Sequence, residues 1–439
     1  MKVLKFGGTS VGSAQRMKEV AKLITDGERK IVVLSAMSGT TNTLVEISDY
    51  LYKKNPEGAN EIINKLESKY RQHIDELFAT PEYKQKGLEL IKSHFDYIRS
   101  YTKDLFTLFE EKVVLAQGEL ISTAMMNYYL QECGVKSVLL PALEYMRTDK
   151  NAEPDPVYIK DKLQVQLELH PDAEIYITQG YICRNAYGEI DNPQRGGSDY
   201  TASLIGAAIN ASEIQIWTDI DGMHNNDPRI VDKTAPVRHL HFEEAAELAY
   251  FGAKILHPTC IQPAKYANIP VRLLNTMDPT APGTLISNDT EKGKIKAVAA
   301  KDNITAIKIK SSRMLLAHGF LRKVFEIFES YQTSIDMICT SEVGVSVSID
   351  NVKHLNEILD DLKKYGTVTV DKDMCIICVV GDLEWENVGF EAKALDAMRD
   401  IPVRMISFGG SNYNISFLIR ECDKKAALQS LSDALFNEE

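Results

Sequence analysis

The sequence predicts an α/β fold with a mainly parallel sheet, followed by two small α+β modules. Three observations support this prediction. The chain opens with a strand, a glycine turn, a helix and a second strand, Lys30–Leu34, which together begin a βαβ unit. Apolar strand patterns then alternate with helical patterns as far as Ser287. From about Ile304 the pattern shortens to strand-and-helix units of roughly 60 to 80 residues, and the unit occurs twice.

Composition and charge exclude several classes of protein. A chain of 439 residues, 44% of them hydrophobic, is long enough for two or three domains. No apolar run approaches the roughly 20 residues of a membrane span, and Met1 leads directly into a strand instead of a signal peptide. The net charge of −12 argues against nucleic acid or an anionic membrane as the main partner. The seven cysteines are scattered and odd in number, so we expect reduced thiols and a cytoplasmic location.

The first turn, KFGGTSVG at residues 5–12, is typical of a phosphate cradle. Gly7 and Gly8 let the backbone approach an anion, and the following helix start directs N–H groups and its positive dipole end at that anion. Lys5, at the end of the strand, would neutralise charge on a transferring phosphoryl group. A strand lysine with a solvated tip is an equally good interpretation of this motif alone.

Two further polar turns follow predicted strands. SAMSGTTN at 35–42 opens the second helix, and RGGSDYTA at 195–202 opens an apolar helix further on. Because open α/β sheets bind ligands at the carboxyl ends of their strands, such turns favour a small-molecule site, although ordinary helix caps remain an alternative. Arg195 offers two-pronged recognition of a carboxylate. Asp199 is either a cap or a group that orients lysines and a metal-bound phosphate.

The other segments supply structure and fewer candidate groups. Residues 57–112 are polar and periodic, which predicts amphipathic helices forming a lobe or cover. Glu119 lies in an apolar helical stretch and is either solvated or a partly buried acceptor for a substrate ammonium. A helix beginning at Phe242 is expected to end near Gly252, which leaves Lys254 in the loop after it. Further strands are expected at Val135–Leu139, Glu174–Thr178, Glu213–Thr218, Val271–Asn275 and Gly283–Ser287, and in the C-terminal part at 304–310, 367–373 and 374–381.

Together these motifs resemble the aspartate kinases of the amino-acid kinase superfamily that carry a C-terminal pair of ACT domains. The resemblance covers essentially the whole chain, and its motifs are KFGGTSV, LSAMSGTTN, QGEL, RGGSDYTA, WTDIDG with DPR, and FGAKILHP, in the family's order. It implies an amino-acid-kinase-like three-layer sandwich at 1–295 and two ferredoxin-like ACT domains at 296–439, one inserted in the other. It also implies transfer of the γ-phosphate of ATP to the β-carboxylate of L-aspartate. The product, 4-phospho-L-aspartate, begins lysine, threonine and methionine biosynthesis.

The resemblance assigns roles to residues of the catalytic region by matching positions. Glu119 is expected to bind the α-ammonium of aspartate, and Arg195 its α-carboxylate. The catalytic residues implied are Lys5, Asp199 and Lys254. The ATP-binding residues implied are Lys5, Gly7, Gly8, Ser10, Thr218, Asp219, His224, Arg229 and Lys254. The aspartate-binding residues implied are Ser35, Thr41, Glu119, Tyr181, Arg195 and Ser198.

The expected chemistry agrees with this set of residues. A substrate carboxylate with a pKa of about 3.9 is already ionised at neutral pH, so the reaction needs no general base. It needs positioning and positive charge, supplied by lysines, helix N-termini and the Mg²⁺ that accompanies ATP, with no metal ligands expected from the protein. The sequence departs from the usual family pattern at three places: Asp191–Gln194 replace the common residues before the arginine, His224 replaces a tyrosine, and Tyr181 replaces a phenylalanine.

In the regulatory half, MLLAHGFLRKVFEIF and SIDMICTSEVGVS resemble the effector-binding ACT domain of lysine-sensitive monofunctional aspartate kinases. From the residues alone, Phe320, Leu321 and Ile335 would be core residues and Asp336 would cap a turn. The resemblance implies feedback inhibition by lysine in preference to threonine, a homodimer or higher homo-oligomer, and no fused homoserine dehydrogenase after Glu439. The effector pocket implied consists of Met314, His318, Gly319, Phe320, Leu321, Ser334, Ile335, Asp336 and Ser341.

Two alternatives stay open at the level of sequence. The first is a superfamily relative that phosphorylates glutamate or N-acetylglutamate, and the ACT pair weighs against it because such relatives generally lack one. The second is a catalytically weak ACT sensor that keeps the kinase fold. Intact Lys5, Asp199 and Lys254 weigh against that second alternative.

Overall fold

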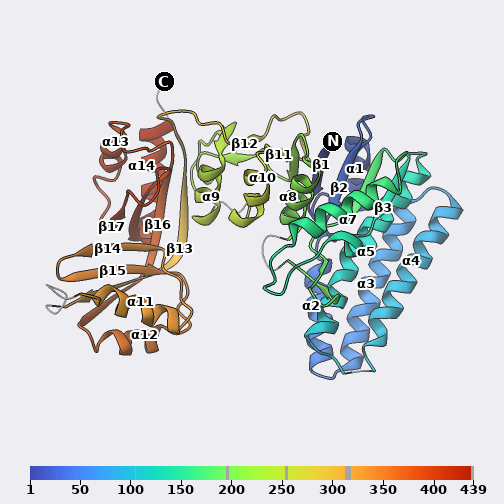
Figure 1. Cartoon of the computed structure of the whole chain (residues 1–439), viewed down its shortest axis with the longest axis horizontal. Helices are drawn as coiled ribbons and strands as arrows, with labels where there is room; N and C mark the ends of the chain where they lie inside the picture. The colour runs from blue at the N-terminus through green and yellow to red at the C-terminus, as the bar shows by residue number, and fades with distance from the viewer. Residues whose placement is uncertain (104, 194–196, 253–255, 312–317, 437–439) are drawn as a thin grey trace. The chain divides into compact units, whose positions relative to one another are not determined.

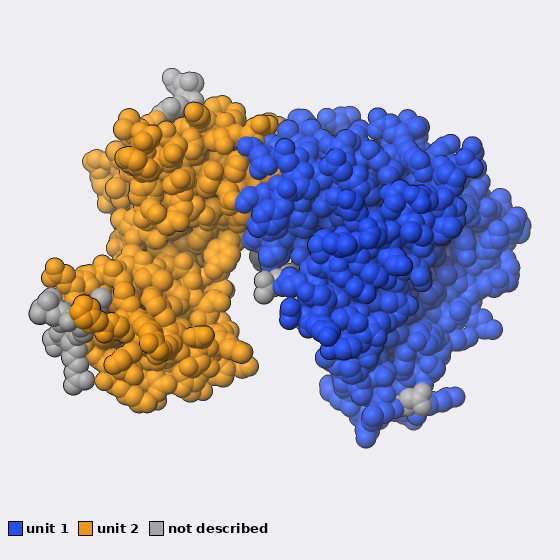
Figure 2. Space-filling model, in the orientation of Figure 1, with its two compact units in different colours: residues 1–223, 256–288 blue, residues 224–255, 289–439 orange. Residues whose placement is uncertain are grey.

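The computed structural model describes residues 1–103, 105–193, 197–252, 256–311 and 318–436. The chain forms two compact units, which are drawn in separate colours in Figure 2. Unit 1 comprises residues 1–223 and 256–288, and unit 2 comprises residues 224–255 and 289–439. None of the described helices combines the length and the apolar character that crossing a bilayer requires.

A mainly parallel sheet forms the centre of unit 1. The strands that unit 1 contributes to it follow the order β12-β11-β7-β1-β2-β4-β3, and all neighbours among them are parallel except β12, which is antiparallel to β11. Strands β2 and β4 are buried along their whole length, as expected for parallel strands covered on both faces. The strands are β1 (Lys2–Phe6), β2 (Lys30–Leu34), β3 (Ser137–Leu140), β4 (Ile175–Gln179), β7 (Ile214–Thr218), β11 (Val271–Asn275) and β12 (Thr284–Ser287).

Helices cover both faces of this sheet and give it three layers. Helix α8 packs on β1, β2 and β7, whereas α5 packs on β2, β3 and β4 (Figure 1). Leu4 and Phe6 of β1 belong to the core shared with α1 to α5. Because side chains alternate along a strand, Lys5 lies on the opposite face, where α8 packs. The helices are α1 (Ala14–Ile24), α2 (Thr40–Tyr52), α5 (Leu108–Glu132), α6 (Ala142–Tyr145), α7 (Pro156–Glu168), α8 (Gly197–Ile209) and α10 (Gln262–Tyr266).

The amphipathic helices expected at 57–112 are confirmed. Helices α3 (Pro56–Leu77) and α4 (Pro81–Ser100) pack side by side and continue into the start of α5 (Figure 1). Tyr70 and Phe95 contact each other inside this lobe, with ring centroids 5.8 Å apart. The lobe also contacts the start of α2, because the Tyr70 hydroxyl lies 2.8 Å from the Thr40 hydroxyl.

An antiparallel sheet of order β14-β15-β13-β16-β18-β17 forms the centre of unit 2. The prediction of separate strands at 367–373 and 374–381 is wrong, because β16 runs unbroken from Thr367 to Gly381. Its partner β13 (Ile295–Lys310) is one residue longer, and the pairing shifts register near Ile304. Asn303 and Asp373, with φ of 60° and 55°, provide the local kink, so the ladder bends without breaking.

The two halves of β13 and β16 serve different modules. The half of β13 beyond Ile304 pairs with β15 and shares a core with α11 and α12. The half of β16 beyond Met374 pairs with β18 and shares a core with α13 and α14. The remaining strands are β5 (Cys183–Arg184), β6 (Ile190–Asp191), β8 (Met223–His224), β9 (Pro236–Val237), β10 (His239–His241), β14 (Met337–Ser341), β15 (Gly344–Ile349), β17 (Val403–Ser407) and β18 (Asn414–Arg420). The remaining helices are α9 (Phe242–Tyr250), α11 (Phe320–Ser330), α12 (Leu355–Leu362), α13 (Phe390–Ala397) and α14 (Lys424–Phe436).

Candidate active site

The residues expected to form the site in unit 1 gather at one edge of the parallel sheet. Lys5 lies near the end of β1, while Ser35, Tyr181 and Asp219 follow β2, β4 and β7 by one or two residues. These strands are neighbours in the order β7-β1-β2-β4 and run parallel, so their carboxyl ends share an edge. The placement at strand ends that the sequence predicted is therefore present for these described residues.

The first two polar turns are bound to each other through the backbone. The Ser35 N–H donates to the Phe6 carbonyl at 3.2 Å, and the Ser38 N–H donates to the Gly8 carbonyl at 3.1 Å. Thr41 follows in the first turn of α2 and is half-buried. These bonds place the glycine turn after β1 directly beside the turn after β2.

Lys5 and Asp199 form an ion pair at this edge. The Lys5 Nζ lies 2.7 Å from the Asp199 Oδ1, and the two side chains are only 12% and 17% exposed. Asp199 belongs to the first turn of α8, on the face of the sheet toward which Lys5 points. The sequence left Asp199 as either a helix cap or a group that orients lysines, and the structure shows it in contact with a lysine. It holds the ammonium at the glycine turn, where a Cβ on Gly7 would lie 3.5 Å from Nζ.

A hydroxyl pair joins the second turn to α8. The Ser35 hydroxyl donates to the Ser198 hydroxyl at 2.9 Å, and the Ser122 hydroxyl of α5 donates to the Ser35 carbonyl at 2.8 Å. Ser198 can lie this close to the turn after β4 only because residue 180 is a glycine, since a Cβ at that position would lie 2.3 Å from the Ser198 hydroxyl. Sequence reasoning did not single out Gly180, although a glycine directly after a buried strand was the available signal.

Glu119 is a buried acceptor and not a solvated helix residue. It is 4% exposed, its Oε1 accepts from the Ala36 N–H at 3.2 Å, and its Oε2 has no hydrogen-bond partner within the described part of the chain. Helix α5 can lie this close to Ala36 because residue 118 is a glycine, since a Cβ there would lie 2.8 Å from the Ala36 Cβ. Burial raises the pKa of the Glu119 carboxyl to about 7. One oxygen is thus left for a hydrogen-bond donor.

Thr276 is a contact of the phosphate cradle that sequence reasoning missed. Its hydroxyl lies 2.8 Å from the Ser10 hydroxyl, and both residues are buried. Its N–H donates to the Thr218 carbonyl at 2.8 Å. Thr276 directly follows β11, so it joins the ends of β7 and β11 to the turn after β1. The signal was a threonine immediately after a predicted strand.

Two departures from the family pattern contact each other. The Asn192 Nδ2 donates to the Tyr181 hydroxyl at 3.0 Å, a bond that a phenylalanine at 181 would not accept. Tyr181 has a φ of 69°, and its N–H donates to the Thr201 hydroxyl of α8 at 3.1 Å. The Asn192–Tyr181 bond therefore connects the loop before α8 to the turn after β4.

Some expected residues belong to unit 2 or lie outside the described residues. His224 is in unit 2, with Nδ1 2.9 Å from the Thr234 hydroxyl. Arg229 is also in unit 2, where its exposed guanidinium lies 2.7 Å from Asp227 and lowers the pKa of that carboxyl. Arg195, Lys254 and Met314 lie outside the described residues.

The expected effector residues lie around α11 and β14 in unit 2. Gly319 caps α11 with a φ of 84°, Phe320 is buried in the core, and Ile335 packs against that core. His318, Leu321, Ser334 and Ser341 are exposed. Asp336 does not act as a turn cap, because its Oδ1 lies 2.7 Å from the Lys301 Nζ.

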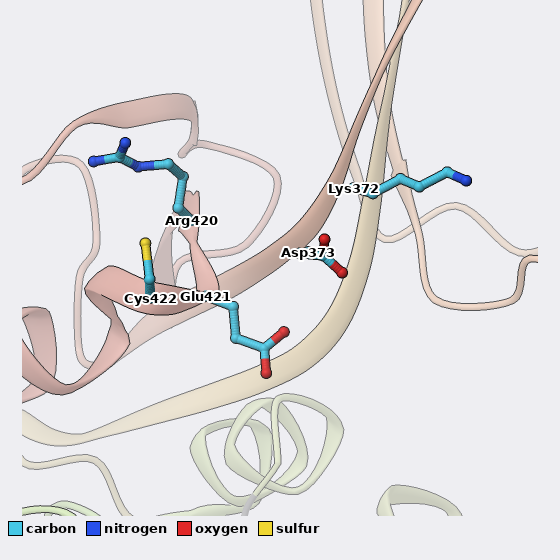
Figure 3. Close-up of a pocket in the computed structure, with 5 residues that line it drawn as sticks. All are labelled: Lys372, Asp373, Arg420, Glu421 and Cys422. Carbon is cyan, nitrogen blue, oxygen red and sulfur yellow. The ribbon is translucent and has the colours of Figure 1, made fainter.

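A hollow of about 560 Å³ lies elsewhere in unit 2 and contains none of the expected residues. Figure 3 shows Lys372 and Arg420 pointing in opposite directions from its walls. Arg420 is bound to Asp423 at 2.8 Å. These side chains do not converge on one ligand position.

Comparisons with known proteins identify the family. The model of the amino acid kinase family matches residues 1–275, more than half of the chain, and an ACT domain model matches residues 377–435. Aspartokinase 1, chloroplastic, of Arabidopsis thaliana is 35% identical over 99% of this chain and 80% of its own length. The chain belongs to the aspartokinases of the amino acid kinase family.

Bacterial aspartokinases agree in sequence and in structure. Lysine-sensitive aspartokinase 3 of Escherichia coli strain K12 is 32% identical over 99% of both chains. The structure of E. coli aspartokinase III with aspartate and ADP has a TM-score of 0.83 at 31% identity, and the form with lysine and aspartate has 0.81 at 32%, each covering 100% of both chains. The family resemblance and the fold class predicted from the sequence are confirmed.

Glu119 gives a pH prediction that does not involve substrate. A carboxyl whose pKa is higher in the folded than in the unfolded protein stabilises the fold less as pH rises from about 4.5 to about 7. Glu119→Gln removes this ionisation. The free energy of unfolding of the variant, relative to the parent, should therefore increase by up to about 3 kcal/mol between about pH 5 and about pH 8.

Urea unfolding at the two pH values measures this difference. Glu46→Gln, which alters an exposed carboxyl on α2, is the matched control and should give no pH-dependent difference. If the difference in free energy of unfolding between Glu119→Gln and the parent is the same at both pH values, burial does not raise the pKa of Glu119.

Proposed function

We propose that this chain is an aspartate kinase, which transfers the γ-phosphate of ATP to the β-carboxylate of L-aspartate. The observation that carries the proposal is a lysine held by Asp199 at a glycine turn, in a unit that also presents a buried carboxylate oxygen of Glu119 with no partner among the described residues. The E. coli relative whose structure contains aspartate and ADP supports this proposal, because ADP is the nucleotide that remains after ATP has given up its γ-phosphate. The product is 4-phospho-L-aspartate, which begins lysine, threonine and methionine biosynthesis.

On the nucleotide side, the turn after β1 would receive the phosphates. Lys5 carries the positive charge, and Gly7, Gly8 and Ser10 present the backbone and a hydroxyl. Thr218 and Asp219 follow at the end of β7. We assign His224, Arg229 and Lys254 to the nucleotide on the family's motif alone.

On the acceptor side, Glu119 would bind the α-ammonium of aspartate through Oε2, which has no partner in the described part of the chain, since a buried carboxylate oxygen is costly without a donor. Arg195 would bind the α-carboxylate. Ser35 and Ser198 are already joined through their hydroxyls and would orient the β-carboxylate. Thr41 and Tyr181 complete the proposed set.

The reaction would proceed by charge control. The β-carboxylate is ionised at neutral pH, so the residues must align it and compensate the charge of the phosphates instead of removing a proton. Asp199 would fix Lys5 for this task. Across the described residues, no group of three or more His, Cys, Asp or Glu side chains could hold a metal ion. We propose that Mg²⁺ arrives with ATP and is bound mainly by the phosphates.

Regulation, assembly and location complete the proposal. Lysine is the proposed feedback inhibitor, supported by an E. coli relative that is named lysine-sensitive. A homodimer or higher homo-oligomer is proposed from the ACT pair. The division into a kinase domain at 1–295 and two ACT domains at 296–439, one inserted in the other, is supported by the shared strands β13 and β16. The cytoplasmic location stays a prediction, since four relatives are named chloroplastic.

A coupled assay of ADP release tests the function. We expect turnover with L-aspartate and little with glutamate or N-acetylglutamate. Preference for either of the other two acids would identify a different kinase of the superfamily, and no turnover with any of them would favour an amino-acid sensor.

Lys5→Ala should lower kcat by about 100-fold or more and raise the aspartate KM far less, because the ammonium contact strengthens in the transition state. Steady-state kinetics with aspartate measures both constants. Lys2→Ala is the matched control, since Lys2 lies on the same strand but pairs with Glu28 at the surface. A Lys5→Ala enzyme with parental kcat would remove Lys5 from the catalytic set.

Arg195→Lys should raise the aspartate KM by about tenfold, because an ammonium cannot reproduce the two-pronged contact with a carboxylate. The KM for ATP should stay within twofold of the parent value, which serves as the internal control. Unchanged aspartate KM and kcat would refute the assignment of Arg195.

Asp336→Ala should raise the lysine concentration needed for half-inhibition by at least about tenfold, because it removes the carboxylate proposed to bind an effector ammonium. Asp360→Ala, an exposed carboxylate of the same module, is the control. Equal inhibition of parent and Asp336→Ala would exclude Asp336 from the effector site.

A further inference from the structure

A buried carboxylate in unit 2 joins the regulatory strands to the end of helix α9. The Asp336 side chain is 1% exposed. Its Oδ1 accepts hydrogen bonds from the Lys301 Nζ at 2.7 Å and from the Tyr250 hydroxyl at 2.8 Å. Its Oδ2 is buried and has no hydrogen-bond partner among the residues described. Asp336 therefore already binds one ammonium and has capacity for a further donor.

Lys301 has a second carboxylate available. Its Nζ lies 2.9 Å from the Asp350 Oδ2 and 4.4 Å from the centre of the Tyr250 ring. The Asp350 side chain is 42% exposed, in contrast to the buried Asp336. If Lys301 left Asp336, its ammonium would keep a partner at Asp350, nearer to solvent. Exchange at Asp336 would thus leave no buried cation unpaired.

Tyr250 connects this cluster to the catalytic region of the sequence. It is the last residue of α9, lies within residues 1–275 matched by the kinase family model, and precedes Lys254 by four residues. Two residues after Tyr250, the backbone at Gly252 packs closely against the Ala300 carbonyl. A Cβ at Gly252, whose φ is 114°, would lie 2.2 Å from that carbonyl. Ala300 is the neighbour of Lys301 in β13. The end of α9 is therefore bound at two adjacent points to the strand that carries Lys301.

We propose that Lys301 competes with the effector's ammonium group for Asp336, and that Tyr250 transmits this exchange to the end of α9. The inference rests on the proposed function, because it takes Asp336 as the effector contact of an aspartate kinase. The occupant it predicts is the ammonium group of an amino acid. When that ammonium binds Asp336, Lys301 moves to Asp350 and the hydrogen bond from Tyr250 is weakened or lost.

The first test is the affinity of the full chain for L-lysine by titration calorimetry. Lys301→Met removes the competing ammonium and keeps the aliphatic stem, so lysine should bind about tenfold more tightly. Lys296→Met is the matched control, because Lys296 lies on the same strand, is even more enclosed than Lys301, and pairs with Glu291 instead of Asp336. Its lysine affinity should stay within twofold of the parent value.

A second variant keeps the test decisive if Lys301→Met does not fold. Lys301→Arg retains the charge and offers a guanidinium that can contact Asp336 and Asp350 together, so lysine should bind several-fold more weakly. Unchanged lysine affinity in a folded Lys301→Met, or in Lys301→Arg, would overturn the competition.

Tyr250→Phe tests transmission separately from binding. We expect lysine to bind within about threefold of the parent affinity, while saturating lysine inhibits aspartate turnover much less. The readout is the ratio of kcat/KM with and without lysine. Parental inhibition in Tyr250→Phe would overturn the role of Tyr250. A parent chain that neither phosphorylates aspartate nor binds lysine would refute the proposed function. If the parent does both, but the Lys301 and Tyr250 variants have the lysine affinity and the inhibition of the parent, only this inference is refuted.

Discussion

The ion pair between Lys5 and Asp199 is the contact on which the candidate active site depends. Strand β1 lies between β7 and β2, so its side chains point alternately toward the two helix layers. Only one of these directions brings Lys5 to the first turn of α8. Because a lysine side chain is flexible and strongly hydrated, a partly buried carboxylate is needed to hold its ammonium in one place. A reaction that needs no general base depends on charges held in this way.

Glu119 and Asp336 solve a similar physical problem in the two units. Each is a buried carboxylate with one oxygen bound to a donor of the chain and the other without a described partner. Such an oxygen is unfavourable until a donor reaches it, and an ammonium group is the most favourable donor for a charged carboxylate. The proposed substrate and the proposed effector are both amino acids. The same chemistry thus accounts for both proposed sites.

Sequence patterns predicted the strand ends well and predicted their cross-connections poorly. The turns after β1 and β2 and the start of α8 follow from apolar runs that stop at glycine and serine, which is a local signal. Thr276 was missed because its partner Ser10 is 266 residues away. The continuity of β16 was missed because Asp371–Asp373 is as polar as a turn. Pairing with β13 at Asp371 and again at Met374 carries the strand across the kink at Asp373. The partners of Asp336 were missed for the same reason, since Lys301 and Tyr250 lie 35 and 86 residues from it.

The sequence by itself determined the family, the order of the glycine turns and the residue types available for charge control. These properties depend on contiguous residues, whose backbone preferences act over one turn or one strand. Only the tertiary structure decided that Glu119 is buried, that Asp199 binds Lys5 and that Asp336 binds Lys301. Burial and ion pairing depend on which distant segments pack together, and the energy of a charge is set by that packing more than by its neighbours in the chain.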